Sequence, residues 1–139
     1  MDTSSYITHT QSISASTAEQ LSRITSEFYA QQAQSFSTTR QMPWQGWQKC
    51  LEAMPQLLSG EKPSVFDVGC GNLRFARFLR DEAGIVPEKY FAVDNCKPLV
   101  ESGETDAQTP QVTFIELDVI KSLLDNTLSS RLIVPSCDL

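Results

Sequence analysis

The sequence Asp-Val-Gly-Cys-Gly-Asn, at positions 67–72, combines an acidic residue with two glycines spaced two positions apart. It follows a short apolar run and precedes a segment with a helical apolar face, so it lies where a buried strand turns into a helix. Such a turn directs backbone N–H groups out of the carboxyl edge of a parallel sheet, and glycine lets a ligand approach the backbone closely. The stretch therefore predicts a ligand-binding site.

Two common nucleotide-binding patterns match this turn poorly. The dinucleotide pattern GxGxxG requires a third glycine at position 74, where this chain has Arg74, and a long cationic side chain there would crowd a pyrophosphate. The phosphate-binding pattern GxxxxGK[S/T] is absent from the sequence. A nicotinamide cofactor therefore remains as an alternative, and hydrolysis of nucleoside triphosphates is disfavoured.

The order acidic-x-Gly-x-Gly resembles the first motif of the class I S-adenosylmethionine-dependent methyltransferases. In that family the glycine turn passes under the amino acid part of the cofactor. The resemblance therefore implies S-adenosylmethionine as the cofactor and contacts to it from the turn, namely from Asp67, Gly69, Cys70, Gly71 and Asn72.

The same resemblance implies contacts from the ends of the next two strands. Asp94, with Asn95 beside it, stands where the family has an acidic residue that binds the ribose hydroxyls, and one carboxylate can accept two hydrogen bonds. Asp118 would accept a hydrogen bond from the adenine amino group, beside the Val119 N–H. Asp94 and Asp118 also suit helix caps, so each has a structural alternative.

The segment FSTTRQMPW, residues 36–44, resembles the signature FSxTRxxPW that precedes the core in the tRNA wobble-uridine carboxymethyl methyltransferases and their bacterial relatives. The resemblance covers roughly residues 25–139 and departs at Leu73, where many members have glycine. We expect Arg40 to pair with the methionine carboxylate of the cofactor, because a guanidinium can hold a carboxylate bidentately. Trp44 would line the mouth of the cofactor site, although its spacing from Trp47 also fits core packing.

Other chemically able side chains favour plain structural roles. Cys70 is expected to fill the turn as a small residue and not to act as a nucleophile. Arg74, Arg77 and Arg80 repeat every third residue along one predicted helix, which is typical of a solvated face.

The hydrophobic pattern predicts the elements that must position the site. Residues 1–16 are rich in Ser and Thr and are expected to form a flexible tail. A capping box at Ser16–Glu19 begins a first helix, and a second follows over residues 44–58, with Pro55 ending it near its last turn. These two N-terminal helices occupy residues 17–60.

Residues 64–139 have the pattern of a βαβαβ unit. Strands are predicted at residues 64–69, 90–94 and 112–118. A helix lies between the first two strands and stops near Gly84, and a short helix covers residues 119–128. The near-continuous apolar strands are typical of a parallel sheet covered on both faces, as in a Rossmann-like doubly wound α/β fold.

The methyltransferase family has seven strands in the order 3-2-1-4-5-7-6, so the resemblance implies a domain over residues 17–139 that is truncated after strand three. Strand one would then be an exposed edge, and we expect the chain to be poorly soluble, to self-associate, or to pair with a second chain there. Residues that hold the methyl acceptor would follow strands four and five, so no catalytic residue is assigned.

Composition narrows the class of protein. Seventeen acidic and eleven basic residues give a net charge of −6, which disfavours broad electrostatic binding to nucleic acid, and His9 is the only histidine. The four cysteines lie far apart in the sequence and no two of them form a CxxC motif, so we expect no metal site. The sequence has no secretory h-region and no long apolar run, so we expect a cytoplasmic protein that does not enter a membrane.

The sequence therefore predicts the cofactor-binding half of an S-adenosylmethionine-dependent methyltransferase that acts on tRNA or a small molecule. Two alternatives remain open at this point: a non-catalytic module that binds a cofactor or a partner, and a nicotinamide-binding Rossmann fragment.

Overall fold

The computed structural model describes residues 12–58, 62–103 and 111–139. These residues form an α/β fold with a parallel three-stranded sheet of strands β1 (Ser64–Val68), β2 (Lys89–Asp94) and β3 (Val112–Glu116), in the order β1-β2-β3. The helices are α1 (Ala15–Thr39), α2 (Gln45–Glu52), the 3-10 helix η1 (Pro55–Leu58), α3 (Arg74–Asp81), α4 (Lys97–Glu101), α5 (Val119–Leu124) and α6 (Leu128–Arg131). The predicted parallel sheet is confirmed.

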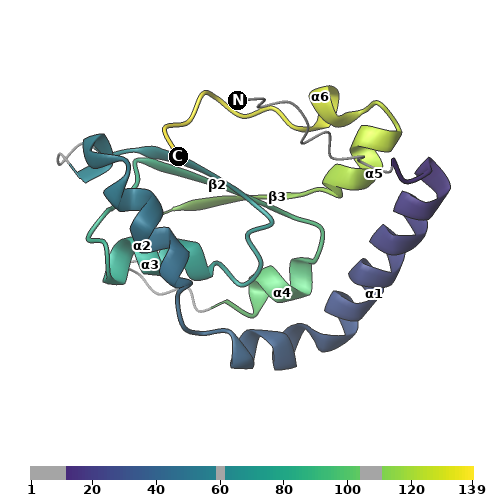
Figure 1. The fold of residues 1–139 in the computed structure, drawn as a ribbon, viewed down its shortest axis with the longest axis horizontal. Coiled ribbons are helices and arrows are strands. Elements are labelled where there is room, and N and C mark those ends of the chain that lie inside the picture. Colours follow the sequence, from purple (N-terminus) through teal and green to yellow (C-terminus); the bar gives the residue numbers. More distant parts are fainter. Residues whose placement is uncertain (1–11, 59–61, 104–110) are drawn as a thin grey trace, which may run out of the picture.

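The core lies between the sheet and the helices α2 and α3, which stand together on one side of it (Figure 1). β2 is the central strand, and its side chains Tyr90, Ala92 and Val93 are almost fully buried. Trp47 of α2 packs on Phe75 and Phe78 of α3, with ring centroids 5.0 and 5.5 Å apart. Burial of these large aromatic rings fixes α3, and with it the turn that precedes α3.

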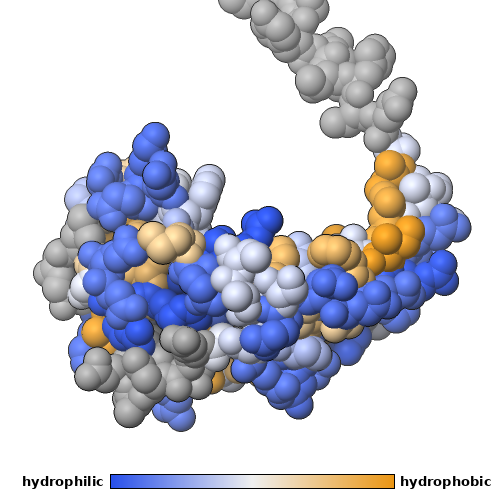
Figure 2. Space-filling view, turned by 90° about the horizontal axis from the view of Figure 1, so that it is seen from below, coloured by the Kyte–Doolittle hydropathy of each residue, from blue (hydrophilic) through white to orange (hydrophobic). Residues whose placement is uncertain are grey.

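Helix α1 is a long arm that runs from α4 to α5 around the carboxyl edge of the sheet (Figure 1). The face that packs on the domain buries small side chains, Ala33 and Ser37. Apolar side chains on a neighbouring face remain half-exposed, and apolar surface follows the arm in the space-filling view (Figure 2). They are Leu21, Ile24 and Phe28.

The outer edge of β1 was expected to lack a neighbour, and this is wrong for its first half. The N–H of Phe66 donates to the carbonyl of Leu139 at 2.7 Å, and the N–H groups of Asp138 and Leu139 donate to the carbonyl of Ser64 at 2.8 and 3.3 Å. The Asp138 carboxylate also accepts from the Ser64 N–H at 2.8 Å. The edge is therefore paired as far as Phe66, in the pattern of a parallel neighbour.

Several predicted element ends are wrong. Helix α1 begins before the predicted capping box, because the Ser14 side chain accepts from the Thr17 N–H at 3.1 Å and caps the helix. The predicted tail therefore ends too late, and its residues 1–11, with His9, lie outside the described part of the chain. The second helix does stop before Pro55, which begins η1, as predicted.

The C-terminal half holds two further differences. The single helix predicted over residues 119–128 is two, α5 and α6, because Asn126 adopts a left-handed backbone with φ of 55°. The short helix α4, which has Pro98 in its first turn, was not predicted at all. Five residues carry too little periodicity to identify a helix from sequence.

Leu73 allows a direct test of backbone strain at the glycine turn. It caps α3 with φ of 59° and is only 3% exposed. A left-handed backbone costs a non-glycine residue about 1–2 kcal/mol, whereas loss of a buried leucine costs about 2–5 kcal/mol. Leu73→Gly should therefore lower the free energy of unfolding by roughly 2 kcal/mol in urea titrations.

Asn126→Gly is the matched control, because Asn126 has nearly the same φ but an exposed side chain. This change should leave stability unchanged or raise it by less than about 1 kcal/mol. A Leu73→Gly variant more stable than wild type would show that strain, and not packing, dominates at position 73.

Candidate functional site

The turn that joins β1 to α3 contains three left-handed residues, the two glycines and Leu73. Gly69 has φ of 76° and Gly71 has φ of 53°, a conformation that side chains rarely adopt. A Cβ atom on Gly69 would meet no atom within 4 Å, so the backbone angle, and not lack of space, requires glycine there. Cys70 between them is 6% exposed and packs into the core, as predicted from its size.

The N–H groups of this turn are bonded within the protein. Those of Gly69 and Cys70 donate to the carbonyl of Val93 at 2.8 and 3.1 Å, and that of Gly71 donates to Asp94 Oδ2 at 2.9 Å. The expectation that several of these groups point at a ligand is therefore wrong. The turn is instead tied to the carboxyl end of β2.

Asp94 holds two backbone segments at once. Its Oδ2 atom accepts from Gly71, and its Oδ1 atom accepts from the N–H of Cys96 at 2.8 Å. A carboxylate oxygen has more than one lone-pair direction, so each can still accept from a ligand hydroxyl. Asp94 is not the residue that caps α4, since that position belongs to Cys96.

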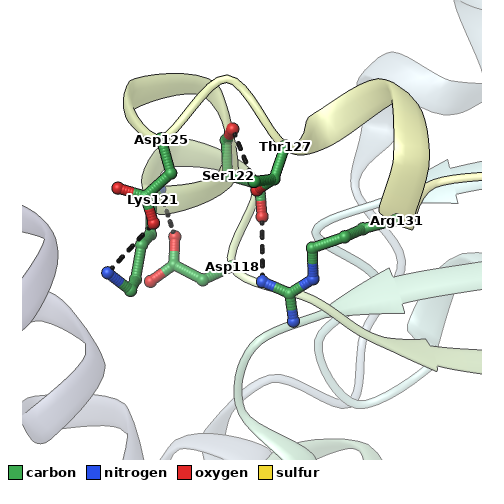
Figure 3. Close-up of polar contacts among 6 residues, drawn as sticks. All are labelled: Asp118, Lys121, Ser122, Asp125, Thr127 and Arg131. Carbon is green, nitrogen blue, oxygen red and sulfur yellow. Dashed lines mark hydrogen bonds and ion pairs between the residues drawn. The ribbon is translucent and has the colours of Figure 1, made fainter.

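Asp118 does have the structural role that was weighed against ligand binding. Its Oδ1 atom accepts from the Lys121 N–H at 2.8 Å and caps α5 (Figure 3). Arg131 of α6 donates to the buried Ser122 hydroxyl at 3.4 Å and braces the corner after α5. Asp118 is thereby fixed at the end of β3 with a second oxygen that makes no protein hydrogen bond among the described residues.

Two adjoining cavities lie at the carboxyl edge of the sheet, under α1. One has a volume of about 490 Å³, and the other about 340 Å³. They share four wall residues, so they form one cleft across the glycine turn; these are Thr25, Gly69, Asp94 and Asn95.

Ten of the eleven predicted site residues line this cleft. The larger cavity includes Asp118 and Val119, and the smaller one includes Arg40, Asp67, Cys70, Gly71 and Asn72. Gly69, Asp94 and Asn95 border both.

Trp44 is the exception, because it lines neither cavity and is 60% exposed. Its indole lies against Gly46, where an added Cβ would come within 2.4 Å of the ring, and edge-on to Trp47. The predicted place at the cofactor mouth belongs to Trp47, which lines the smaller cavity.

An acidic group forms the floor of the smaller cavity. Asp67 Oδ2 accepts from the Tyr90 hydroxyl at 2.6 Å. Burial raises the pKa of the Asp67 carboxyl, the Tyr90 hydrogen bond lowers it in part, and the nearby Asp94 raises it further. Burial and the same two aspartates raise the pKa of the Cys70 thiol, so it stays protonated and is a poor nucleophile.

Two guanidinium groups stand in the wall of the same cavity. Arg40 lies over the Phe36 ring at 4.5 Å, and Arg74 lies over the Trp47 ring at 5.2 Å and donates to the Met42 carbonyl at 3.0 Å. Burial and the Arg40 charge lower the pKa of Arg74. Neither guanidinium has a carboxylate partner within the described residues, so both charges are free to meet an anion.

The solvated arginine face predicted on α3 is therefore wrong. Arg74 belongs to the cavity wall, and Arg77 donates to the Asn72 carbonyl at 2.6 Å and to Gln41 at 3.4 Å. Arg80 pairs with Asp81. The three-residue spacing gave no sign of these contacts, because it does not show where the surrounding carbonyls and side chains lie. Met42 and Gln41 come from a distant segment, whereas Asn72 and Asp81 are close in the sequence.

Asn72 connects α1 to the site. Its amide Nδ2 donates to the Arg40 carbonyl at 3.1 Å and to the Ser37 hydroxyl at 3.2 Å, and the residue is 4% exposed. This contact holds the end of α1, and with it Arg40, against the glycine turn. The α1 residues Thr25, Tyr29 and Phe36, which also line the cleft, were missed by the sequence analysis.

Within residues 12–58, 62–103 and 111–139, no three His, Cys, Asp or Glu side chains converge as metal ligands, and no helix has the length and apolar character to cross a bilayer. Comparison with family models, curated proteins and solved structures finds no significant match. The function must therefore be argued from the cleft itself.

Asp67→Asn tests the stability cost of the buried Asp67 carboxylate. The folded state raises the pKa of Asp67, so the ionised carboxylate costs stability above that pKa, and the cost disappears as pH falls through it. An asparagine removes the buried charge and keeps an acceptor for Tyr90. At neutral pH the variant should unfold at a higher temperature than wild type. Its free energy of unfolding should be higher by roughly 1 kcal/mol, and the difference should shrink in acid.

Asp81→Asn should have the opposite effect on stability. Its hydrogen bond to Arg80 lowers the pKa of Asp81, which contributes stability at neutral pH that is lost as pH falls through that pKa. Thermal unfolding as a function of pH measures both variants. A destabilised Asp67→Asn variant at neutral pH would contradict the assigned cost.

Proposed function

We propose that the cleft binds S-adenosylmethionine and that the chain is the cofactor-binding part of a methyltransferase with a Rossmann-like, doubly wound sheet. The observation that carries the proposal is the distribution of charge in the smaller cavity. Asp67 lies at its floor, and Arg40 and Arg74 lie in its wall. An α-amino acid carries an ammonium and a carboxylate on the same carbon atom. It can therefore pair its ammonium with Asp67 and its carboxylate with the two arginines at once.

The adenosine part of the cofactor suits the larger cavity. That cavity is mainly apolar, with a few polar residues in its lining. In the proposed complex Asp94 and Asn95 bind the ribose, and Asp118 and Val119 bind the base. Asp94 lies in the shared wall, where the ribose joins the amino acid part. The apolar walls come from β1, β2, α1 and the segment just after β3, through Val68, Val93, Leu21 and Leu117.

A nicotinamide dinucleotide has less support. Its pyrophosphate requires backbone donors at the strand-to-helix turn, and those of Gly69, Cys70 and Gly71 are already bonded within the protein. The carboxylates of Asp67 and Asp94 would also repel two phosphates.

Methyl transfer from a sulfonium to a good nucleophile depends on alignment of the reacting atoms and on exclusion of water. The residues of this chain contribute by binding and orienting the cofactor: the cavity walls remove water, and the two charged ends fix the direction of the amino acid part. We assign no catalytic residue. The acceptor we propose is tRNA or a small molecule.

Equilibrium titration with three ligands tests the proposal. S-adenosylmethionine should bind, 5′-methylthioadenosine should bind more weakly because it lacks the amino acid part, and NAD should not bind. Arg40→Met should weaken S-adenosylmethionine about tenfold or more, since a hydrogen bond to a charged group contributes about 1.5–3 kcal/mol. Its effect on methylthioadenosine should be small.

Lys97→Met is the matched control, because Lys97 is an exposed cation that pairs with Glu101 and does not line the cleft. It should leave both affinities unchanged. Binding of NAD without binding of S-adenosylmethionine would overturn the proposal in favour of the nicotinamide alternative.

A second candidate is a module that binds a partner through β1 without methyl transfer. The paired part of the β1 edge stops at Phe66, and Val68 is 53% exposed. An added strand from a second chain or a second copy could extend the pairing. Sedimentation across a concentration series tests self-association, and a monomer at every concentration would remove the second copy as the partner.

A further inference from the structure

Tyr90 is a buried side chain with a polar hydroxyl group. Among the described residues this hydroxyl makes one hydrogen bond, to the cleft residue Asp67. Tyr90 is the second residue of β2, is 1% exposed, and donates its hydroxyl to Asp67 Oδ2 at 2.6 Å. The cross-strand neighbour of Asp67 is Ala92, two residues after Tyr90 and on the same face of the sheet. The small alanine side chain leaves room for the phenol to extend along the sheet toward the carboxylate.

This contact fixes how the Asp67 carboxylate is presented. One oxygen, Oδ2, is held by Tyr90, and no protein group bonds the other among the described residues. No buried side-chain oxygen in the described structure lacks a partner, so the free Asp67 Oδ1 is reachable from the cavity that Asp67 lines. The carboxylate therefore presents one oriented oxygen to a ligand.

The hydrogen bond also opposes protonation of Asp67. Burial and the Asp94 charge both raise the pKa of Asp67, and the Tyr90 hydroxyl is the group that lowers it. Burial and the Asp67 charge raise the pKa of Tyr90, so the phenol keeps its proton and acts only as the donor. The other titratable groups that line this cavity are Tyr29 of α1, Arg40 just after α1, the neutral Cys70 thiol and Arg74 of α3.

We propose that Tyr90 is a positioning residue, which holds one oxygen of Asp67 and so directs the other at the cationic end of the bound ligand. The inference rests on the proposed function, because the cation is the ammonium of S-adenosylmethionine. It adds a residue outside the cleft wall, and it predicts a pH dependence that a purely structural tyrosine would not produce.

Tyr90→Phe tests the proposal, because it keeps the buried ring and removes only the hydroxyl. Without the hydrogen bond, Asp67 takes up its proton at higher pH, and a neutral carboxyl attracts an ammonium poorly. Titrations with S-adenosylmethionine between about pH 4.5 and pH 6.5, where the ligand amine stays protonated because an α-amino group has a pKa of about 7.7–8.0, should show the variant losing affinity at higher pH than wild type. The two curves should approach one another toward the upper end.

Ser130→Ala is the control, because it also removes a hydroxyl that donates a hydrogen bond, here to the Thr127 carbonyl at 2.9 Å, and Ser130 lines neither cavity. Its pH profile should match wild type. In an Asp67→Asn background, Tyr90→Phe should produce no further shift, because the titrating group is gone. This background also exposes any change in affinity that comes only from altered packing.

The outcomes separate the two claims. Failure of the wild-type protein to bind S-adenosylmethionine at any pH would reject the proposed function. Binding by wild type with an unshifted profile in Tyr90→Phe would reject the role of Tyr90 and leave the proposed function intact. A shift that persists in the Asp67→Asn background would also reject it, because the effect would not pass through Asp67.

Discussion

The connection between the glycine turn and the end of β2 is the contact on which the site depends. The Val93 carbonyl accepts from two turn N–H groups, and the Asp94 carboxylate accepts from a third. These bonds fix the path of the chain between β1 and α3, so the turn is formed without help from a ligand. They also consume the donors that a phosphate would need, which directs the cleft toward a different ligand chemistry.

The remaining parts of the site attach to this turn. Asn72 holds the end of α1 against it, and so brings Arg40 over the smaller cavity. The Arg74 guanidinium lies over the ring of Trp47 in α2. Two cations from separate segments thus line the same cavity as Asp67, and the proposal of a zwitterionic ligand rests on this charge pattern.

The sequence predicts the local features of this structure well. Short apolar strands followed by acidic residues identify the sheet and its carboxyl edge, and the two glycines identify the turn, because strand burial and left-handed angles impose strong residue preferences. The sequence did not show the cap of α1 at Ser14, the break between α5 and α6 at Asn126, or the short helix α4. Single capping bonds and short helices leave a weak pattern.

Contacts between distant segments could not be predicted from residue spacing. The three arginines of α3 have one spacing but three different environments, and only Arg74 reaches the cleft. Trp44 and Trp47 belong to one periodic stripe, yet the glycine at position 46 lets one indole fold back onto the surface while the other packs inward. Tertiary packing, and not local preference, decides these cases.

A crystal structure of the protein with S-adenosylmethionine would show directly whether the cleft binds this cofactor as proposed. The proposed binding mode places the ligand carboxylate beside Arg40 and Arg74, its ammonium beside the free oxygen of Asp67, and its adenosine in the larger cavity. A ligand with its amino acid part turned away from the arginines, or bound outside the cleft, would contradict this binding mode.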